Sequence, residues 1–336
     1  MKLKVVLFLA IVFSLNACIN EPESLGNTNK GNFESLWRII DTRYCYLDYK
    51  KINWDSIHAA YEPRVLNTMD KVTFFNLMGE MLAELKDGHV NLYSDFNTSR
   101  YWKWYTEYPD NYNAKLILNN RYLGSNYLAV GGLRYNRIAK GKVGYLSYPD
   151  FSVAFSDVNM YNVMTYFSTC DALIIDVRNN GGGLLSMAEQ FASYFFKEET
   201  ITGYMQHKTG SGHADFSNPE ALKTPAHSKL QWERPVIVLS NRRSYSSTNS
   251  FISRMKQAPN VRILGDTSGG GGGLPLSSEL PNGWMVRFSS SPMFDADMKH
   301  TEFGVEPDIA VELLVSDEIA GYDTLIERAI SLLLTK

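Results

Sequence analysis

A chain of 336 residues, 44% of them hydrophobic, is long enough to form one large domain or two modest ones. Its formal net charge of −3 at pH 7 gives no general attraction to nucleic acid or to an anionic membrane surface. We therefore expect no nucleic-acid partner. The isolated pair Arg242 and Arg243 fits a solvated surface or a cleft wall better than a nucleic-acid patch.

Residues 1–17 have the pattern of an export signal: Lys2 and Lys4 precede an apolar run that ends at Leu15-Asn16-Ala17-Cys18. A cysteine directly after the cut is typical of a bacterial lipoprotein, in which its thiol carries diacylglycerol. The alternative is an ordinary signal peptide or a short anchor helix. The apolar core of about 11 residues is short for an anchor helix, since spanning a bilayer takes about 20. We expect lipidation at Cys18 and an exported protein, held on the periplasmic or cell-surface face only by this lipid, with residues 18–32 as a polar tether.

Residues 33–93 are predicted to form a small N-terminal helical bundle. Apolar side chains recur at spacings of three and four over 33–44, Asn53 is placed to cap a second helix, and Asp70 a third with an apolar stripe over 74–85. We interpret this stripe as packing. Residues 94–140 are a predicted connecting segment, with strand-like runs at 115–118 and 127–130.

From residue 141 to residue 336 the pattern changes to strands alternating with helices, which predicts an α/β layered domain. Continuous apolar runs are typical of strands buried on both faces. The predicted strands are 143–148, 172–177, 235–240, 261–264, 284–289 and 309–313, and the predicted helices are 184–196, 247–255 and 323–334. Two cysteines remain after the export signal, Cys45 and Cys170, and the sequence leaves open whether they pair.

Three segments carry residues suited to chemistry. The first is 85–90, where His89 follows a predicted helix and a glycine, and by itself it is more often a surface or capping histidine. The second is 176–183, where Gly181 and Gly182 stand between a strand and a helix. The amides there can form an oxyanion hole, and a phosphate cradle or a plain glycine turn are the alternatives.

The third segment, 240–249, again joins a strand to a helix through a tight turn. Ser246 stands at the turn, and the amide of Ser247 is placed as an oxyanion donor. Serines at helix N-termini are commonplace, so the segment alone does not establish a site. Taken together, the three segments supply a base, an oxyanion hole and a nucleophile, which are the parts of acyl transfer.

The order of these segments resembles the tail-specific (C-terminal-processing) serine protease family. That family has a Leu-x-Asp-x-His element, then Asp-Leu-Arg-Asn-Asn-Pro-Gly-Gly, a Ser-Ala-Ser-Ala-Ser-Glu turn and a Val-Gly-Glu strand end. The corresponding segments here are Leu85 to His89, Asp176 to Gly183, Ser244 to Asn249, and Leu264 to Asp266.

The departures from this pattern point to one branch of the family. Many members use a Ser–Lys dyad, but Gly271 occupies the place of that lysine. The glycine-rich turn resembles the tricorn and interphotoreceptor retinoid-binding-protein branch, in which a histidine is the base and a glutamate supports it. The resemblance assigns these roles to His89 and Glu302. Some members link the two through a serine where this chain has Gly88, and Asn249 replaces a glutamate after the nucleophile turn.

The resemblance implies a ClpP/crotonase-like catalytic domain without a PDZ module, acting on peptide or protein substrates. It implies Ser246, His89 and Glu302 as catalytic residues, an oxyanion hole from Gly181, Gly182 and Ser247, and no metal or cofactor. His207 and His213 lack regular metal-ligand spacing. The rival interpretations are an inactive member that binds peptide or lipid, and a crotonase-like acyl-CoA enzyme. The sequence does not predict an oligomeric state.

Overall fold

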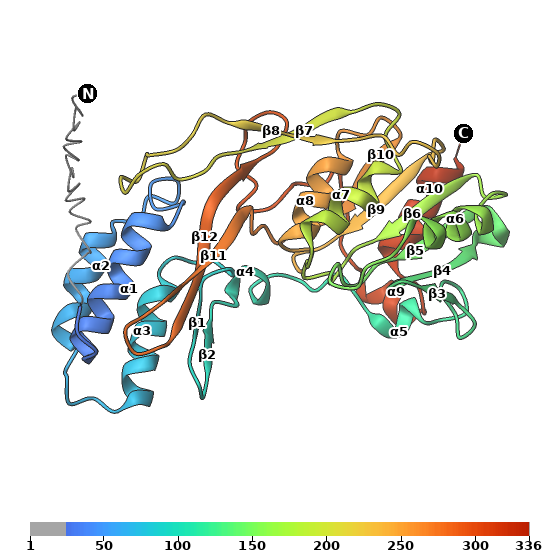
Figure 1. The fold of residues 1–336 in the computed structure, drawn as a ribbon. Coiled ribbons are helices and arrows are strands. Elements are labelled where there is room, and N and C mark those ends of the chain that lie inside the picture. The colour runs from blue at the N-terminus through green and yellow to red at the C-terminus, as the bar shows by residue number, and fades with distance from the viewer. Residues whose placement is uncertain (1–24, 336) are drawn as a thin grey trace, which may run out of the picture.

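Two β-sheets and the helices packed on them make up residues 25–335, the part of the chain that the computed structural model describes (Figure 1). The predicted export signal and Cys18 lie outside the described residues. The N-terminal helices lie at one end of the molecule, β11 and β12 in the middle, and the larger sheet at the other end. No helix within residues 25–335 is long and apolar enough to cross a membrane.

The larger sheet has seven strands in the order β13-β10-β9-β6-β5-β4-β3. Its five strands from β5 to β13 are parallel, and β3 and β4 join antiparallel at one edge. The bounds are β3 Leu128–Val130, β4 Leu133–Ile138, β5 Val143–Ser147, β6 Ala172–Asp176, β9 Val236–Ser240, β10 Val261–Gly265 and β13 Ile309–Ala310.

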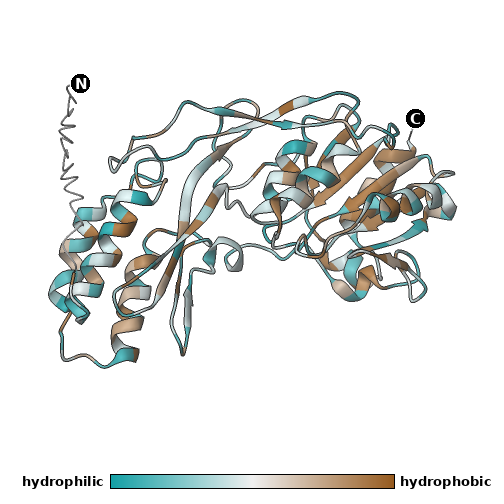
Figure 2. Cartoon of the chain, in the orientation of Figure 1, coloured by the Kyte–Doolittle hydropathy of each residue, from teal (hydrophilic) through white to brown (hydrophobic). Residues whose placement is uncertain are grey.

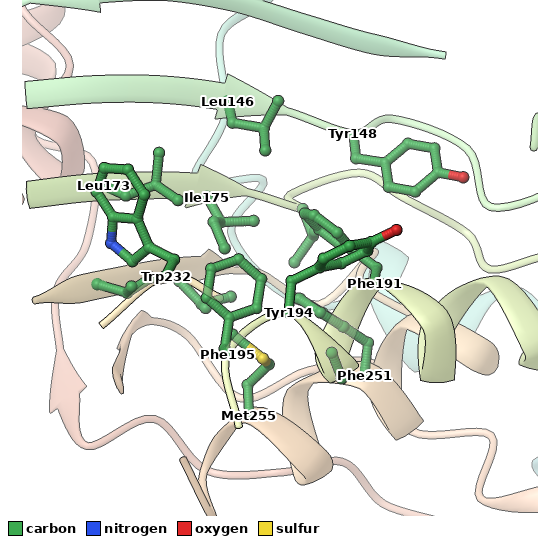
Figure 3. Close-up of a cluster of buried hydrophobic side chains, with 14 of the residues drawn as sticks. Leu146, Tyr148, Leu173, Ile175, Phe191, Tyr194, Phe195, Trp232, Phe251 and Met255 are labelled. Atoms are coloured by element: carbon green, nitrogen blue, oxygen red, sulfur yellow. The ribbon is translucent and has the colours of Figure 1, made fainter. Parts of the chain in front are cut away.

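Helices cover both faces of this sheet, which explains why β5, β6 and β9 are buried along their whole length and apolar except mainly at their carboxyl ends. Hydrophobic residues concentrate in these central strands (Figure 2). Side chains of α7 and α8, among them Phe191 and Phe251, pack against Leu146 and Ile175 on one face (Figure 3). Leu325 and other residues of α10 cover the opposite face. The helices of this part are α5 Ala114–Ile117, α6 Asp157–Tyr166, α7 Leu185–Ser193, α8 Ser247–Met255, α9 Val315–Ile319 and α10 Thr324–Leu334.

The second sheet runs β2-β1-β12-β7-β8, with β11 also paired to β12. Its long strand β12 buries Val286 and Phe288 against the N-terminal helices. These helices are α1 Asn29–Arg43, α2 Trp54–Tyr61 and α3 Lys71–Ala83, and the short α4 is Lys103–Thr106. The strands are β1 Asn91–Tyr93, β2 Thr98–Arg100, β7 Thr200–Met205, β8 Glu220–Thr224, β11 Gly273–Glu279 and β12 Met285–Phe294.

Several predicted elements are confirmed. Asn53 and Asp70 cap α2 and α3 through their side chains, and α8 has the predicted bounds. Other expectations differ from the structure. Helix α1 begins within the predicted tether, because the Thr28 side chain accepts a hydrogen bond from Gly31 N and caps it. The predicted strand 115–118 is not a strand: residues 115–117 belong to the short helix α5, which Asn113 caps, and Leu118 ends it.

The predicted division at residues 93 and 140 also differs from the sheet topology. Strand β1, which follows the helices, pairs with β12 from the C-terminal half. Strands β3 and β4, within the predicted connecting segment, belong to the larger sheet. The two sulfhydryls of Cys45 and Cys170 are buried and unpaired.

Candidate active site

Ser246 stands between β9 and α8, just beyond the carboxyl end of this interior strand of the larger sheet. Its backbone has φ 59° and ψ −120°, a conformation that non-glycine residues rarely adopt and that costs about 1–3 kcal/mol. The surrounding loops hold this conformation. Ser246 N donates to Gly270 O at 2.9 Å, and Ser244 Oγ donates to Val177 O at 2.8 Å. The turn therefore presents the Ser246 hydroxyl at the first turn of α8, beside the amide of Ser247.

His89 stands just before β1, in the other sheet, and only 2% of its surface is exposed. Its Nε2 atom lies 2.9 Å from Ser246 Oγ, although 157 residues separate the two in sequence. Asp87 fixes the histidine backbone, because its Oδ1 accepts a hydrogen bond from His89 N at 2.7 Å. Tyr44 Oη and Ser289 Oγ donate to the other oxygen of Asp87, both at 2.9 Å. The predicted base and nucleophile are thus brought together at hydrogen-bond distance.

The protonation state of His89 suits a proton acceptor. Burial lowers the pKa of the imidazole to about 4, and the nearby cations Arg287 and Lys50 act in the same direction. The Asp87 carboxylate opposes them and raises this pKa. The imidazole is therefore neutral at pH 7, with a lone pair available on one ring nitrogen.

The glycine segment after β6 lies against the Ser246 turn. A Cβ added to Gly182 would lie 2.9 Å from Ser246 Cβ and 3.1 Å from Ser247 N, and this residue has φ 103°. Only glycine allows that approach. Within residues 25–335, the amides of Gly181 and Ser247 have no protein acceptor. The amide of Gly182, also a predicted oxyanion donor, already donates to Asn180 Oδ1 at 2.9 Å, because that side chain folds back two residues along the chain.

The glycine segment is anchored by a buried ion network. The Arg178 guanidinium, 3% exposed, contacts Asp176 at 2.6 Å and Asp323 at 3.0 Å. The backbone of Asn179 and the side chain of Asn241 add a hydrogen bond of 2.9 Å between this segment and the nucleophile turn. These contacts fix the glycine segment after β6 and the Ser246 turn after β9 relative to each other.

Glu302 does not hydrogen-bond to His89. Its Oε1 lies 2.6 Å from Lys50 Nζ, and its Oε2 accepts from Gly272 N at 3.1 Å. Burial and the Asp87 carboxylate raise the pKa of Glu302, and the ammonium of Lys50 opposes this shift by stabilising the carboxylate. Of the two ways in which the resemblance lets Glu302 support the histidine, directly or through water, the direct hydrogen bond is absent, and the carboxylate forms an ion pair with a buried lysine.

Sequence analysis assigned no role to Lys50 or Asp87. The Lys50 side chain is 4% exposed, and its Nζ also lies 3.8 Å from Asp87 Oδ2. Burial alone would lower the pKa of Lys50, but Glu302 and Asp87 raise it above its ordinary value. The one signal for Lys50 in the sequence is its place in a pair of lysines, with Lys51, at the end of the aromatic stretch 44–49.

Comparison with known proteins places this geometry in a family. The sequence matches peptidase family S41 over residues 142–311, about half of the chain. The chain belongs to peptidase family S41. A second match, to the tricorn protease C1 domain, covers residues 26–83.

Individual relatives agree with this assignment. A solved structure of a candidate peptidase from Parabacteroides merdae ATCC 43184 is 46% identical, with a TM-score of 0.89, and the match covers 93% of this chain and 98% of that one. The tricorn protease of Thermoplasma acidophilum is 25% identical over 202 residues, which are 58% of this chain and 17% of that protein. The carboxy-terminal processing protease CtpA of Bacillus subtilis is 25% identical over 142 residues, 42% of this chain and 28% of that protein. The chain thus spans less than a third of the length of these two curated relatives.

Two departures from the S41 pattern have structural explanations. At Gly271, in place of the lysine of other members, an added Cβ would lie 2.5 Å from the Tyr245 ring, so that no side chain fits. Asn249 joins α8 to the segment before Glu302: its Nδ2 donates to Thr301 O at 3.0 Å, and its Oδ1 accepts from Ser268 Oγ at 2.6 Å.

A pocket of about 440 Å³ borders the site on the side of Gly88 and Glu302. Its walls combine aromatic rings with charged groups of both signs. They include Tyr101, Trp104, Tyr108, Phe303, Lys86 and Arg242. Within residues 25–335 no cluster of three or more His, Cys, Asp or Glu side chains could hold a metal ion. The His213 ring nitrogens lie within salt-bridge distance of the carboxylates of Asp41 and Asp48.

Proposed function

We propose that this chain is an exported serine endopeptidase that hydrolyses peptide bonds of peptide or protein substrates through an acyl-enzyme. The observation that carries the proposal is the 2.9 Å contact between His89 Nε2 and Ser246 Oγ in a chain that belongs to peptidase family S41. Contact of this kind is required for a base that activates a serine nucleophile.

In the proposed reaction, Ser246 Oγ attacks the substrate carbonyl while His89 Nε2 takes the hydroxyl proton. The amides of Ser247 and Gly181 face the developing oxyanion, at the N-terminus of α8 and in the glycine segment. His89 then gives its proton to the leaving amine, and a water molecule, activated by the same imidazole, hydrolyses the acyl-enzyme. The Asp87 carboxylate stabilises the imidazolium that forms, because it favours the protonated ring.

Labelling with a serine-directed fluorophosphonate tests the proposal. Wild type should be labelled at Ser246, whereas Ser246→Ala and His89→Ala should lose both labelling and peptide hydrolysis, since members of such a unit act together. Ser250→Ala, one turn further along α8, is the matched control and should label like wild type. A well-folded wild type that is neither labelled nor active would contradict the proposal and favour a binding role.

We propose in addition that the mature protein is lipid-anchored through Cys18. The pattern Leu15-Asn16-Ala17-Cys18 after an apolar run supports this. Mass spectrometry of the mature N-terminus should find a diacylglyceryl cysteine, and Cys18→Ala should release the protein from membranes. An unmodified N-terminus at another residue would refute lipidation while leaving the peptidase proposal intact.

A further inference from the structure

Position 88, next to the histidine, is filled by aromatic side chains. A Cβ added to Gly88 would lie 2.5 Å from Trp104 Nε1 and 2.8 Å from Tyr245 Oη. A serine at this position, which the family resemblance would supply in some members, therefore does not fit. The Tyr245 hydroxyl lies close to where the missing serine side chain would start.

Two polar atoms beside this position are buried without a partner. Within residues 25–335 neither His89 Nδ1 nor Tyr245 Oη has a hydrogen-bond partner at ordinary distance, and both residues are more than nine-tenths buried. Their ring centroids are 4.9 Å apart, with the planes tilted by 57°. Buried polar groups in native proteins are almost always paired, so two neighbouring unpaired atoms suggest one bond that tightens in the working enzyme.

The tautomer of His89 requires such a bond. For Nε2 to accept the Ser246 proton, the neutral ring must carry its own proton on Nδ1. That N–H needs an acceptor, and Glu302 is held by Lys50 at 2.6 Å. The hydroxyl oxygen of Tyr245, on a ring whose centroid lies 4.9 Å from that of the imidazole, is a buried acceptor without a partner of its own among the described residues. The Gly273 carbonyl also faces the imidazole and raises its pKa, so it is the rival acceptor.

The Tyr245 ring is held firmly enough for this task. Trp104 stacks on it with centroids 4.1 Å apart and planes 25° from parallel. On its other side Gly271 leaves no room for a side chain, and Tyr245 N donates to Asn180 O at 3.0 Å. Burial, Asp87 and Glu302 raise the pKa of the phenol, so the hydroxyl keeps its proton and remains neutral.

We propose that Tyr245 is a positioning residue whose hydroxyl accepts a hydrogen bond from His89 Nδ1 and fixes the ring for proton transfer from Ser246. The inference rests on the proposed peptidase function. It assigns to the residue just before the nucleophile the orienting task that Glu302, paired with Lys50, does not perform.

Tyr245→Phe tests the inference, because it removes the hydroxyl and keeps the ring stacked on Trp104. We expect kcat for peptide hydrolysis to fall at least about tenfold with KM within about twofold of wild type, since only proton transfer is impaired. The thermal midpoint should stay near that of wild type. The matched control is Tyr148→Phe, which removes a hydroxyl bonded to Val153 O at 2.6 Å within the α/β domain and should leave kcat unchanged.

A reciprocal exchange separates orientation from simple structural damage. In a Trp104→Ala background Tyr245→Ala should lose activity, and adding Gly88→Ser should recover at least about tenfold in kcat, because both side chains that a Cβ at position 88 would meet are then removed and the new hydroxyl can accept from Nδ1. Wild-type kcat in Tyr245→Phe, or no recovery when Gly88→Ser is added, would overturn the inference and leave the Gly273 carbonyl as the orienting group. If instead the proposed peptidase function is wrong, the fluorophosphonate will not label Ser246 even in wild type, so labelling of wild type distinguishes the two failures.

Discussion

Burial decides how His89 responds to pH. The unperturbed pKa of histidine is about 6.5, and the sequence alone predicts an acid limb of activity near that value. The buried ring instead has its pKa lowered to about 4: burial, Arg287 and Lys50 lower this pKa, and Asp87 only partly offsets them. Because the base must be neutral, activity depends on the fraction of unprotonated imidazole.

We therefore predict that kcat/KM remains near its maximum down to about pH 5 and falls as pH passes below about 4 to 5. The lowered pKa keeps the base form populated at mildly acidic pH, and protonation removes it only below that range. Peptide hydrolysis measured from about pH 4 to 8, with circular dichroism to verify folding, checks this expectation. A limb centred at or above about 6.5 would show that the imidazole is better solvated in the working enzyme.

The backbone of Ser246 allows a second prediction at the residue scale. Both Ser246→Ala and Ser246→Gly should be inactive, but the glycine variant should be more stable by about 1 kcal/mol, because φ 59° costs glycine nothing. Chemical denaturation measures the difference. The same pair at Ser250, inside α8, should show the opposite order, with glycine less stable by about 1 kcal/mol. Equal stabilities at position 246 would mean that the turn relaxes in the variants.

Between elements, Lys50 connects the N-terminal part to the C-terminal part. It follows α1, and its partner Glu302 lies between β12 and β13, so the buried pair joins segments about 250 residues apart in the chain. With Asp87 also 3.8 Å away, one ammonium faces two buried carboxylates. Removing one partner of a buried ion pair costs far more free energy of unfolding than removing one partner of an exposed pair.

Lys50→Met should lower the free energy of unfolding by about 3–5 kcal/mol, because it leaves Glu302 buried without its cation. Adding Glu302→Gln should restore a large part of the loss. Denaturation of both single variants and the double variant gives the coupling energy. Lys256→Met, which breaks a partly exposed pair with Asp308, should cost about 1 kcal/mol or less. Additive effects at positions 50 and 302 would show that the two side chains are not coupled.

At the scale of the whole molecule, the second sheet is built from both ends of the chain. β1 pairs with β12, and Val286 and Phe288 of β12 are buried beneath helices of the N-terminal part. The proposed base comes from one part and the proposed nucleophile from the other. The site therefore exists only when both are folded against each other.

A fragment of residues 141–336 should for this reason fail to fold as a stable monomer. It keeps β12 but loses β1 and the helices that cover it, so that the strand edge and the side chains of Val286 and Phe288 are left exposed. Size-exclusion chromatography and circular dichroism should show aggregation or a partly folded chain, whereas residues 25–336 should be monodisperse and cooperatively folded. A monomeric fragment with a sharp unfolding transition would contradict this view.

The sequence by itself determined the elements whose pattern is local. The apolar runs of β6 and β9 predicted strands buried on both faces, and side-chain caps at Asn53 and Asp70 predicted helix starts. The motif order also pointed to His89 and Ser246, since each stands where an element ends. These features depend on neighbours a few residues away, and such patterns are visible in the chain.

Only the tertiary structure decided how the buried charged and polar groups are paired. Glu302 contacts Lys50 and not His89, and Tyr245 occupies the space at Gly88. The pairing of β1 with β12, and with it the boundary between the two parts, was likewise set by packing. A buried charge takes whichever partner the packing brings within a few ångströms, and these partners lie far apart in sequence. No local sequence pattern predicts which two of these groups meet in space, because their separation depends on how every element between them is packed.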